Sequence, residues 1–289
     1  MFEFIENEFL CVEVNALGAE LKSIYNKKNQ KEYLWQAHPA FWPRRAPVLF
    51  PIVGKLKNNQ YFAEDKCWEL GQHGFARDAI FQLIDKTGNS LTYSLKKSAD
   101  SLKVYPYRFE LQIQYAINRN RLSVQYEVNN LDDKNIYFSI GGHPGFNCPL
   151  NSGEKLTDYF IEFEKAETAE RHLLTEGLVT GKTEKILNKE KVLGLNEDLF
   201  KADAIVLKNL NSSYLKLKNK ASDYELIFNF RGFPYLGIWK KSEAPFICIE
   251  PWYGLADRIT FDGSLEEKEG IVSLSEGDKF VCEYSIEVK

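Results

Sequence analysis

Three polar side chains occur where the neighbouring residues predict burial or a tight turn. His73 and His143 each lie in a glycine-containing turn, and Glu250 ends the apolar run 246–249. Glycine lets a ligand or another segment approach the backbone closely, and burial raises the pKa of a carboxylate toward the range that suits a general base. An imidazole and such a carboxylate, brought together, could remove one proton and supply another.

Each of these side chains also has a purely structural interpretation. A single histidine is commonly a hydrogen-bonded core residue or an exposed loop residue, and we keep that interpretation for His38 and His172. Glu250 could form an ion pair with a nearby arginine such as Arg258. Taken one motif at a time, the sequence leaves both interpretations open.

Arginines flank the same motifs. Arg44 and Arg45 directly precede the apolar run 46–53, and Arg77 follows His73 by four residues. The guanidinium group presents its donors as a rigid fork, which suits hydroxyl groups and anions. The sequence does not decide whether Arg44 or Arg45 faces a site. The arginines could equally form ion pairs with aspartates, namely Asp78, Asp203 or Asp257.

Aromatic residues surround these polar motifs. They are Trp35, Trp42, Phe75, Phe146, Trp239, Trp252 and Tyr253. Flat rings can cover the C–H faces of a sugar while polar side chains hold its hydroxyl groups. The combination predicts a site for a polyhydroxylated ring, with Trp252 among the residues that contact it.

Two other classes of site use the same residue types. Two histidines and a carboxylate can hold a metal ion, as in iron oxygenases. We expect no metal site, because neither His73 nor His143 lies in the H-x-D/E arrangement that such sites often use. The aromatic and basic residues could also belong to a protein that binds sugar without catalysis.

The five cysteines lie far apart and form no C-x-x-C pair, which argues against a disulfide framework and a zinc knuckle. We expect reduced, mostly buried thiols. Cys148 follows His143 by five residues, so a nucleophilic cysteine there remains an alternative.

Charge and hydropathy exclude several partners. The 289-residue chain has a formal net charge of −4, which gives no attraction to nucleic acid or anionic lipid. The longest apolar stretch, 46–54, contains two prolines and is far shorter than the roughly 20 residues of a membrane-spanning helix. The N-terminal residues do not resemble a secretory signal, so we expect a cytoplasmic protein.

The elements that must position these groups are mostly β-strands. Residues 122–128 alternate between apolar and polar side chains without a break. Further strands are expected at 12–14, 111–115, 159–163, 215–217, 226–230, 246–249 and 284–288. The run 246–249 is continuously apolar, which predicts burial on both faces. Helical periodicity is nearly absent, and the best candidate is a single turn at 196–200 capped by Asn196.

No linker, charge block or repeat divides the chain, so residues 1–289 are expected to form one domain. An all-β chain of this size must protect many strand edges, and a propeller would show a repeat. We therefore predict a large antiparallel β-sandwich.

Four motifs together resemble the aldose 1-epimerase (galactose mutarotase-like) family, most closely its lactose-operon X-type branch. They are the runs 44–54 (RRAPVLFPIVG), 73–77 (HGFAR), 141–146 (GGHPGF) and 248–257 (CIEPWYGLAD). The resemblance spans most of the chain in the same order. It implies the large antiparallel supersandwich of that family and the interconversion of the α and β anomers of a free sugar, without cofactor or metal.

Carried over by position, the resemblance implies Glu250 as general base and His143 as general acid. His73 and Asp203 would hold substrate oxygens. One position departs from the pattern, because Gly54-Lys55 is followed by Asn58-Asn59 and not by the Asn-Arg pair of galactose mutarotases. Arg44 or Arg77 would replace that arginine, as in the hexose-6-phosphate epimerase branch.

The expected ligand is therefore a sugar or a sugar phosphate, bound by a monomer or a homodimer. In the expected mechanism, Glu250 removes the proton of the C1 hydroxyl while His143 protonates the ring oxygen. We expect burial to raise the pKa of Glu250 and the adjacent carboxylate to keep His143 protonated.

Overall fold

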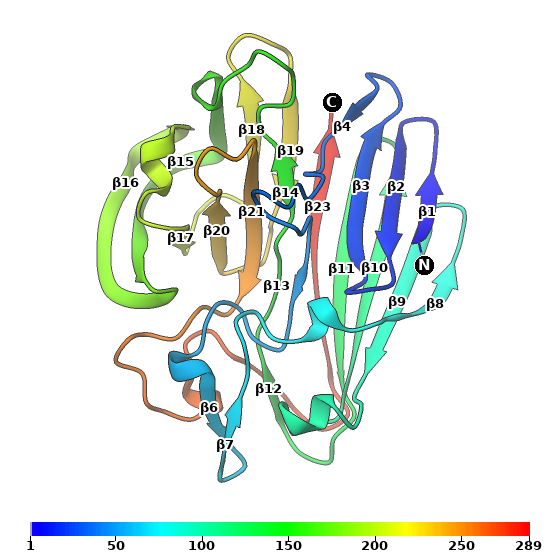
Figure 1. The fold of residues 1–289 in the computed structure, drawn as a ribbon, viewed down its shortest axis with the longest axis vertical. Helices are drawn as coiled ribbons and strands as arrows, with labels where there is room; N and C mark the ends of the chain where they lie inside the picture. The colour runs from blue at the N-terminus through cyan, green and yellow to red at the C-terminus, as the bar shows by residue number, and fades with distance from the viewer. Residues whose placement is uncertain (1) are drawn as a thin grey trace.

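The computed structural model describes residues 2–289, and it consists almost entirely of antiparallel strands (Figure 1). A four-stranded sheet has the order β1-β2-β3-β4 and contains β1 (Phe2–Glu6), β2 (Leu10–Asn15), β3 (Glu20–Asn26) and β4 (Lys31–Glu32). Two small sheets pair β6 (Gln60–Ala63) with β7 (Lys66–Glu69), and β12 (Ile136–Phe138) with β22 (Val272–Leu274).

The remaining strands form one 15-stranded sheet. They are β5 (Val48–Leu49), β8 (Gln82–Lys86), β9 (Ser90–Lys96), β10 (Phe109–Asn118), β11 (Arg121–Asn130), β13 (Ile140–Gly142), β14 (Gly145–Asn147), β15 (Tyr159–Thr175), β16 (Leu178–Gly194), β17 (Ile205–Lys208), β18 (Tyr214–Asn219), β19 (Glu225–Asn229), β20 (Tyr235–Trp239), β21 (Phe246–Tyr253) and β23 (Lys279–Val288). The main path runs β5-β13-β21-β20-β17-β15-β18-β19-β23-β11-β10-β9-β8, while β14 pairs with β21 and β16 with β15.

The helices of the described residues are short 3-10 turns. They are η1 (Lys57–Asn59), η2 (Ala76–Asp78), η3 (Ser101–Lys103), η4 (Leu156–Asp158), η5 (Glu197–Phe200) and η6 (Leu265–Glu267). The predicted turn near Asn196 is confirmed as η5, because the Asn196 side chain accepts a hydrogen bond from the Leu199 amide at 3.1 Å. Within residues 2–289, no helix combines the length and the apolar character needed to span a bilayer.

The alternating pattern of the sequence produces the sandwich. Along β10 and β11 every second side chain is buried, and the register pairs Leu111 with Val128 and Ile113 with Tyr126. The four-stranded sheet lies beside β9–β11 in Figure 1, and the Tyr115 hydroxyl donates to the Ala19 carbonyl at 2.7 Å across the two layers. The predicted large antiparallel β-sandwich is confirmed.

Every strand that the sequence predicted is present, and the one predicted to be buried on both faces is β21. Seven of its eight residues are buried. It lies between β20 on one side and β13 and β14 on the other, as the third strand from the β5 end of the main path. A polar side chain on this strand is therefore enclosed by protein unless a cavity reaches it.

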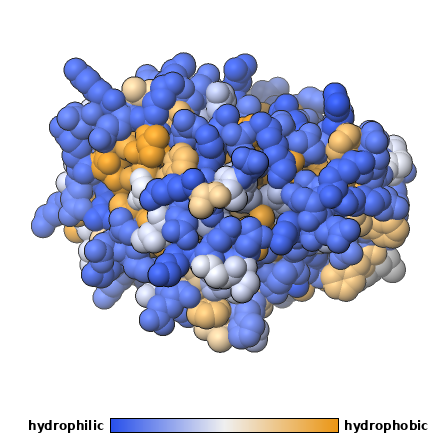
Figure 2. All heavy atoms as spheres, turned by 90° about the horizontal axis from the view of Figure 1, so that it is seen from above, coloured by the Kyte–Doolittle hydropathy of each residue, from blue (hydrophilic) through white to orange (hydrophobic). Residues whose placement is uncertain are grey.

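The surface is polar, as expected from the charge content. Figure 2 shows mostly hydrophilic residues over the face seen from above, with hydrophobic residues in separate small patches. The five cysteines are free thiols, and Cys148, Cys248 and Cys282 are buried while Cys67 is exposed.

Candidate functional site

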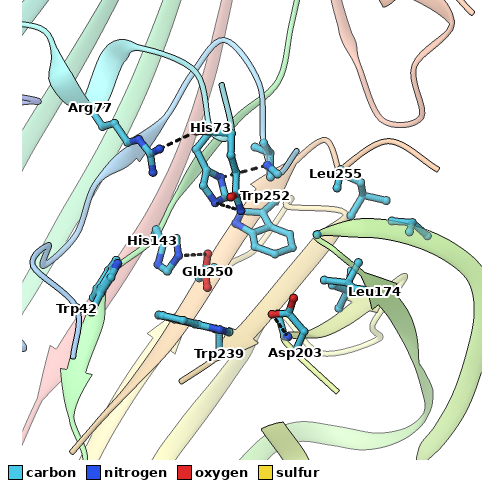
Figure 3. A pocket seen from close by; sticks show the side chains of 18 residues that line it. Trp42, His73, Arg77, His143, Leu174, Asp203, Trp239, Glu250, Trp252 and Leu255 are labelled. Carbon is cyan, nitrogen blue, oxygen red and sulfur yellow. Dashed lines mark hydrogen bonds and ion pairs between the residues drawn. The ribbon is translucent and has the colours of Figure 1, made fainter. Parts of the chain in front are cut away.

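The register of β21 places His143 opposite Glu250. Gly141 of β13 pairs with Trp252, and Gly145 of β14 pairs with Cys248, so the interruption between these two short strands falls opposite the glutamate. His143 occupies that interruption. Its Nε2 lies 3.2 Å from Oε2 of Glu250, and Figure 3 shows the two side chains pointing toward each other. Residues 107 positions apart in the sequence thus form one pair.

A cavity of about 300 Å³ opens onto this pair. Its aromatic lining comes from Trp42, Trp239 and Trp252, and its apolar wall from Leu174, Val179 and Leu255. His73, Arg77, His143, Asp203 and Glu250 supply the polar lining. Six of the seven predicted site residues therefore line one cavity, and the seventh, Arg44, does not. A hollow with aromatic walls and convergent polar groups has the character of a small-molecule site.

Burial sets the protonation of the pair. Glu250 is 2% exposed, and desolvation raises its pKa well above the ordinary value. Desolvation also lowers the pKa of His143 to about 3, with further lowering from Arg77 and Arg44. The prediction for Glu250 is therefore confirmed in direction, whereas the prediction of a protonated His143 is wrong. Glu250 is itself neutral when its pKa is raised in this way, so it supplies no negative charge that would hold the imidazolium.

The contact between the two side chains lacks hydrogen-bond geometry. Oε2 of Glu250 and Nδ1 of His143 are both buried without a hydrogen-bond partner among residues 2–289. Buried polar atoms are nearly always paired in folded proteins. Two orphans on neighbouring side chains at the floor of a cavity are typical of a site that is completed by a ligand.

His73 is held in a defined tautomer at the roof of the cavity. Its backbone has a left-handed φ of 67°, its amide donates to the Gly54 carbonyl at 2.8 Å, and its Nδ1 accepts from the Gly54 amide at 3.1 Å. Burial, then His143, Arg77 and Arg44, lower its pKa well below the ordinary value. A neutral imidazole that accepts through Nδ1 carries its proton on Nε2. His73 can therefore donate through Nε2, which lies 3.3 Å from Nε2 of Gln72.

The three arginines lie in different surroundings. Arg77 lines the cavity, donates to the Gln72 carbonyl at 2.7 Å, and has its Nε 3.8 Å from Oδ2 of Asp78. Arg44 forms an ion pair with Asp78 at 2.9 Å, as the structural alternative allowed. Arg45 donates to the Gln36 carbonyl at 3.3 Å. Arg77 is thus the arginine that presents its guanidinium group to the cavity.

Asp203 stands across the cavity from His73 in Figure 3. Its φ of 69° is in the left-handed region, and its Oδ1 accepts from the Ala204 amide at 2.8 Å. Strained backbone of this kind is concentrated at functional sites, and here both His73 and Asp203 have it. The sequence motif around Asp203 was degenerate, so its position in the lining comes from the fold.

Two glycines make room for the indole of Trp252. A Cβ atom on Gly237 would lie 2.4 Å from the Trp252 ring, and one on Gly141 would lie 2.6 Å from it. Both glycines belong to the strands that flank β21, so the ring lies flat across the sheet. The indole N–H lowers the pKa of Glu250, in opposition to burial, although Trp252 Nε1 has no hydrogen-bond partner among residues 2–289.

Asp257 connects the segments that form the apolar wall. Its Oδ1 accepts from Nζ of Lys268 at 2.5 Å and its Oδ2 from the Lys57 amide at 2.9 Å. Its backbone N–H donates to the Lys55 carbonyl, and its carbonyl accepts from the Val179 amide. The sequence predicted neither these contacts of Asp257 nor the wall residues of the β15–β16 hairpin, because no local pattern distinguishes them.

The structure contradicts two alternatives, which are an ion pair between Glu250 and Arg258 and a nucleophilic Cys148. Arg258 pairs with Glu269 at 2.8 Å and not with Glu250. Cys148 is fully buried, is absent from the cavity lining, and has a pKa raised by burial, which disfavours the thiolate. The remaining aromatic candidates, Trp35, Phe75, Phe146 and Tyr253, also lie outside the lining.

One cluster in residues 2–289 has the composition and spacing of a metal site. His143, Cys248 and Glu250 each offer one ligand atom, and these atoms all lie within 4.8 Å of one another. His73, which the sequence suggested as a second imidazole ligand, is not a member. The third group is a thiol that the sequence analysis did not connect to the site, although Cys248 and Glu250 are two residues apart on one strand.

Comparison with known proteins agrees with the fold and with the motifs. The family model described as aldose 1-epimerase matches residues 2–269. The chromosomal LacX protein of Lactococcus lactis subsp. lactis is 37% identical over 294 residues, which cover 98% of both chains. A galactose mutarotase related enzyme from Lactobacillus acidophilus is 35% identical with a TM-score of 0.96, over 100% of this chain and 97% of that one.

A galactose mutarotase-like protein from Lactobacillus casei is 32% identical, with a TM-score of 0.95 and full coverage of both chains. These likenesses extend over the whole sandwich, including the strands that bring His143 to Glu250. The resemblance inferred from four sequence motifs is confirmed, and the chain belongs to the aldose 1-epimerase family.

Proposed function

We propose that this protein is an aldose 1-epimerase that interconverts the α and β anomers of a hexose by opening and closing the ring. The observation that carries the proposal is the 3.2 Å approach of His143 Nε2 to Glu250 Oε2 at the floor of a cavity lined by three tryptophans. Opening a hemiacetal needs a base at one oxygen and an acid at another, and both oxygens are bonded to C1. A neighbouring acid and base match that requirement.

The proton inventory of the pair supports the reaction. With Glu250 protonated and His143 neutral, the pair holds one proton, and its transfer across the 3.2 Å contact gives a carboxylate beside an imidazolium. The carboxylate takes the proton of the C1 hydroxyl while His143 protonates the ring oxygen. The C1–O bond of the ring breaks as the C1 carbonyl forms. Rotation about C1–C2 presents the other carbonyl face, and the reverse transfers close the ring.

The other polar residues would bind and orient the sugar. His73 is neutral with its proton on Nε2, so it can donate to an oxygen on which negative charge develops. Arg77 can donate through its guanidinium group, which lines the cavity. Asp203 retains a carboxylate oxygen for a hydroxyl group, and Trp42, Trp239 and Trp252 can cover the C–H faces of the ring.

The test is an anomerisation screen. Freshly dissolved α-glucose, α-galactose and other aldoses would be followed by polarimetry, with and without the protein. We expect an accelerated approach to equilibrium, and loss of that acceleration in Glu250→Gln and His143→Gln with sugar affinity nearly retained. A protein that binds sugar without catalysis would show affinity but no acceleration. Wild-type rates in Glu250→Gln would refute the assignment of the base.

A second candidate substrate is a hexose 6-phosphate. Arg77 favours it, because a guanidinium group that lines the cavity can donate to a phosphate oxygen. The same screen would include 6-phosphorylated sugars and the variant Arg77→Met, with Arg44→Met as the matched control. If the phosphate is bound by Arg77, only Arg77→Met should lose the preference for phosphorylated over free sugar.

A further inference from the structure

We propose that His143, Cys248 and Glu250 form a binding site for a thiophilic divalent cation, with Zn²⁺ the best match, and that the bound ion blocks the acid–base pair. His143 and Glu250 line the cavity, Cys248 is buried beside them, and the ligand atoms of the three are all within 4.8 Å of one another. The inhibitory part of this proposal rests on the proposed function, whereas the binding part does not.

The backbone geometry points the thiol toward the pair. Cys248 and Glu250 are alternate residues of β21, so their side chains project from the same face of the strand. Gly145 pairs with Cys248, and a Cβ atom on that glycine would lie 3.4 Å from the sulfur. His143 follows β13 and reaches over from the same neighbouring segment. One imidazole, one thiol and one carboxylate thus converge from two adjacent segments of the sheet.

The spacing is close to that of a zinc site. Zinc bonds are about 2.0–2.3 Å long and tetrahedral, so two ligand atoms on one ion are roughly 3.3–3.8 Å apart. The His143–Glu250 separation of 3.2 Å is near this distance, and the other separations, which are at most 4.8 Å, must shorten when an ion binds.

The charges of the set match the ion. When the Cys248 thiol and the Glu250 carboxyl each release a proton, one thiolate, one carboxylate and one neutral imidazole make a bound divalent cation electrically neutral, which removes the main cost of a charged group at a buried site. Glu250 Oε2 is buried without a hydrogen-bond partner among residues 2–289, so an ion bound here would supply one.

The donor set selects the class of ion. Thiolate and imidazole ligands favour Zn²⁺ and related borderline or soft ions over Mg²⁺, which prefers oxygen ligands and retains its water. The cavity lining includes His143 and Glu250, so the ion would enter by the same route as the sugar. Because metal and sugar would need the same two side chains, binding should be competitive.

The first experiment measures binding without activity. Chelator-treated protein would be titrated with Co²⁺, which absorbs in the near ultraviolet when it is bound to a thiolate. We expect one equivalent to bind with that absorption in wild type, and the absorption to be lost in Cys248→Ser. Cys67→Ser, which removes an exposed thiol far from the cluster in sequence, is the matched control and should retain it. Absence of the band in wild type, or its persistence in Cys248→Ser, would overturn the site.

The second experiment measures the consequence. In a buffer that does not bind metal, Zn²⁺ should inhibit anomerisation while Mg²⁺ at the same concentration should not. Cys248→Ser should retain the activity measured without metal, and should need more than about 10-fold more Zn²⁺ for half inhibition, because it loses a direct ligand. Equal inhibition of Cys248→Ser and wild type would contradict the proposal. Cobalt binding through Cys248 without any anomerisation would instead reject the proposed function and keep the site.

Discussion

Two acid–base pairs are buried in this protein, and they differ in how completely their polar atoms are paired. Lys268 and Asp257 are each 2% exposed at the side chain, while His143 and Glu250 are 10% and 2% exposed. Both oxygens of Asp257 accept hydrogen bonds, from Lys268 and from the Lys57 amide. The second pair leaves an oxygen and a nitrogen unpaired.

Similar burial therefore serves two purposes. The paired carboxylate of Asp257 has its partners within the protein and fixes the wall of the cavity. The carboxylate of Glu250 is short of partners, and burial raises its pKa because nothing nearby supports the charge sufficiently. The comparison teaches that completeness of pairing, more than burial itself, separates a structural ion pair from a reactive one.

The largest expected effect is on catalysis at the incompletely paired site. Glu250→Gln should reduce turnover by about 10²–10⁴-fold, because a positioned base contributes that much to proton transfer. Its free energy of unfolding at pH 7 should equal or exceed that of wild type, since glutamine carries no charge that resists burial. Polarimetry and urea denaturation measure the two quantities. A large loss of stability with retained turnover would show that Glu250 has a structural role and not a reactive one.

Breaking the fully paired Lys268–Asp257 site should mainly reduce the stability of the protein and affect turnover less. Lys268→Met leaves the Asp257 carboxylate buried without its cation, which should cost about 3–5 kcal/mol in the free energy of unfolding. The wall carried by Asp257 would also shift, so KM should rise more than kcat falls. Urea denaturation and steady-state kinetics on the same preparation measure both.

A double variant provides the control for that prediction. Asp257→Leu combined with Lys268→Met removes both charges, and an apolar replacement of a buried ion pair is often neutral or stabilising. We therefore expect the double variant to regain most of the lost stability. If it is as unstable as Lys268→Met, the hydrogen bonds from Lys57 and not the ion pair hold the wall.

The sequence was sufficient for the fold and for the members of the site, but not for its electrostatics. Period-two patterns in strands such as β10 and β11 report directly on which face is buried, so the sandwich could be predicted. The 3.2 Å contact depends on the long-range register of β13 and β14 with β21, which no local pattern encodes. The neutral form of His143 follows from the total burial and from two arginines, and the sequence contains neither quantity.

The dependence on long-range contacts also explains why the sequence could not distinguish Arg44 from Arg77 or assign a role to Asp257. Arg44 and Arg77 look alike in the sequence, and both lie near Asp78, at 2.9 and 3.8 Å, but the fold places only Arg77 in the lining of the cavity. Asp257 belongs to a recognised motif, but its role depends on contacts with segments from Lys55 to Lys268. Such roles are properties of tertiary contacts, so they become visible only when the strands are assembled.

The opposite pKa shifts of His143 and Glu250 predict opposite effects of pH on stability. The His143 pKa is lowered from about 6.5 to about 3, so its contribution is fully present above pH 6.5 and is lost as pH falls. The Glu250 pKa is raised from 4.5, so its contribution is present below pH 4.5 and is lost as pH rises. Between pH 6.5 and pH 4.5, acidification therefore reduces the stability contributed by His143 and increases the stability contributed by Glu250.

Single variants should therefore separate the slopes. Relative to wild type, Glu250→Gln should lose stability on acidification from pH 6.5 to pH 4.5, by up to about 1.4 kcal/mol per pH unit. His143→Gln should gain stability over the same interval. Urea denaturation at several pH values measures both. Parallel curves for the two variants would show that the buried pair does not titrate as the comparison requires.

The smallest expected effect concerns the one group that partly supports the Glu250 charge. The indole N–H of Trp252 lowers the pKa of Glu250, so Trp252→Phe should raise that pKa further while keeping an aromatic ring between Gly141 and Gly237. Because the pair must keep the proton that passes to His143, activity should fall as pH rises through the Glu250 pKa, and in Trp252→Phe that fall should move to higher pH, by about one unit or less. Trp239→Phe changes another tryptophan of the cavity that does not act on this pKa, and it should leave the profile in place. An unchanged profile in Trp252→Phe would mean that burial alone sets the protonation of Glu250, and that its carboxylate is even less supported than the comparison with Asp257 implies.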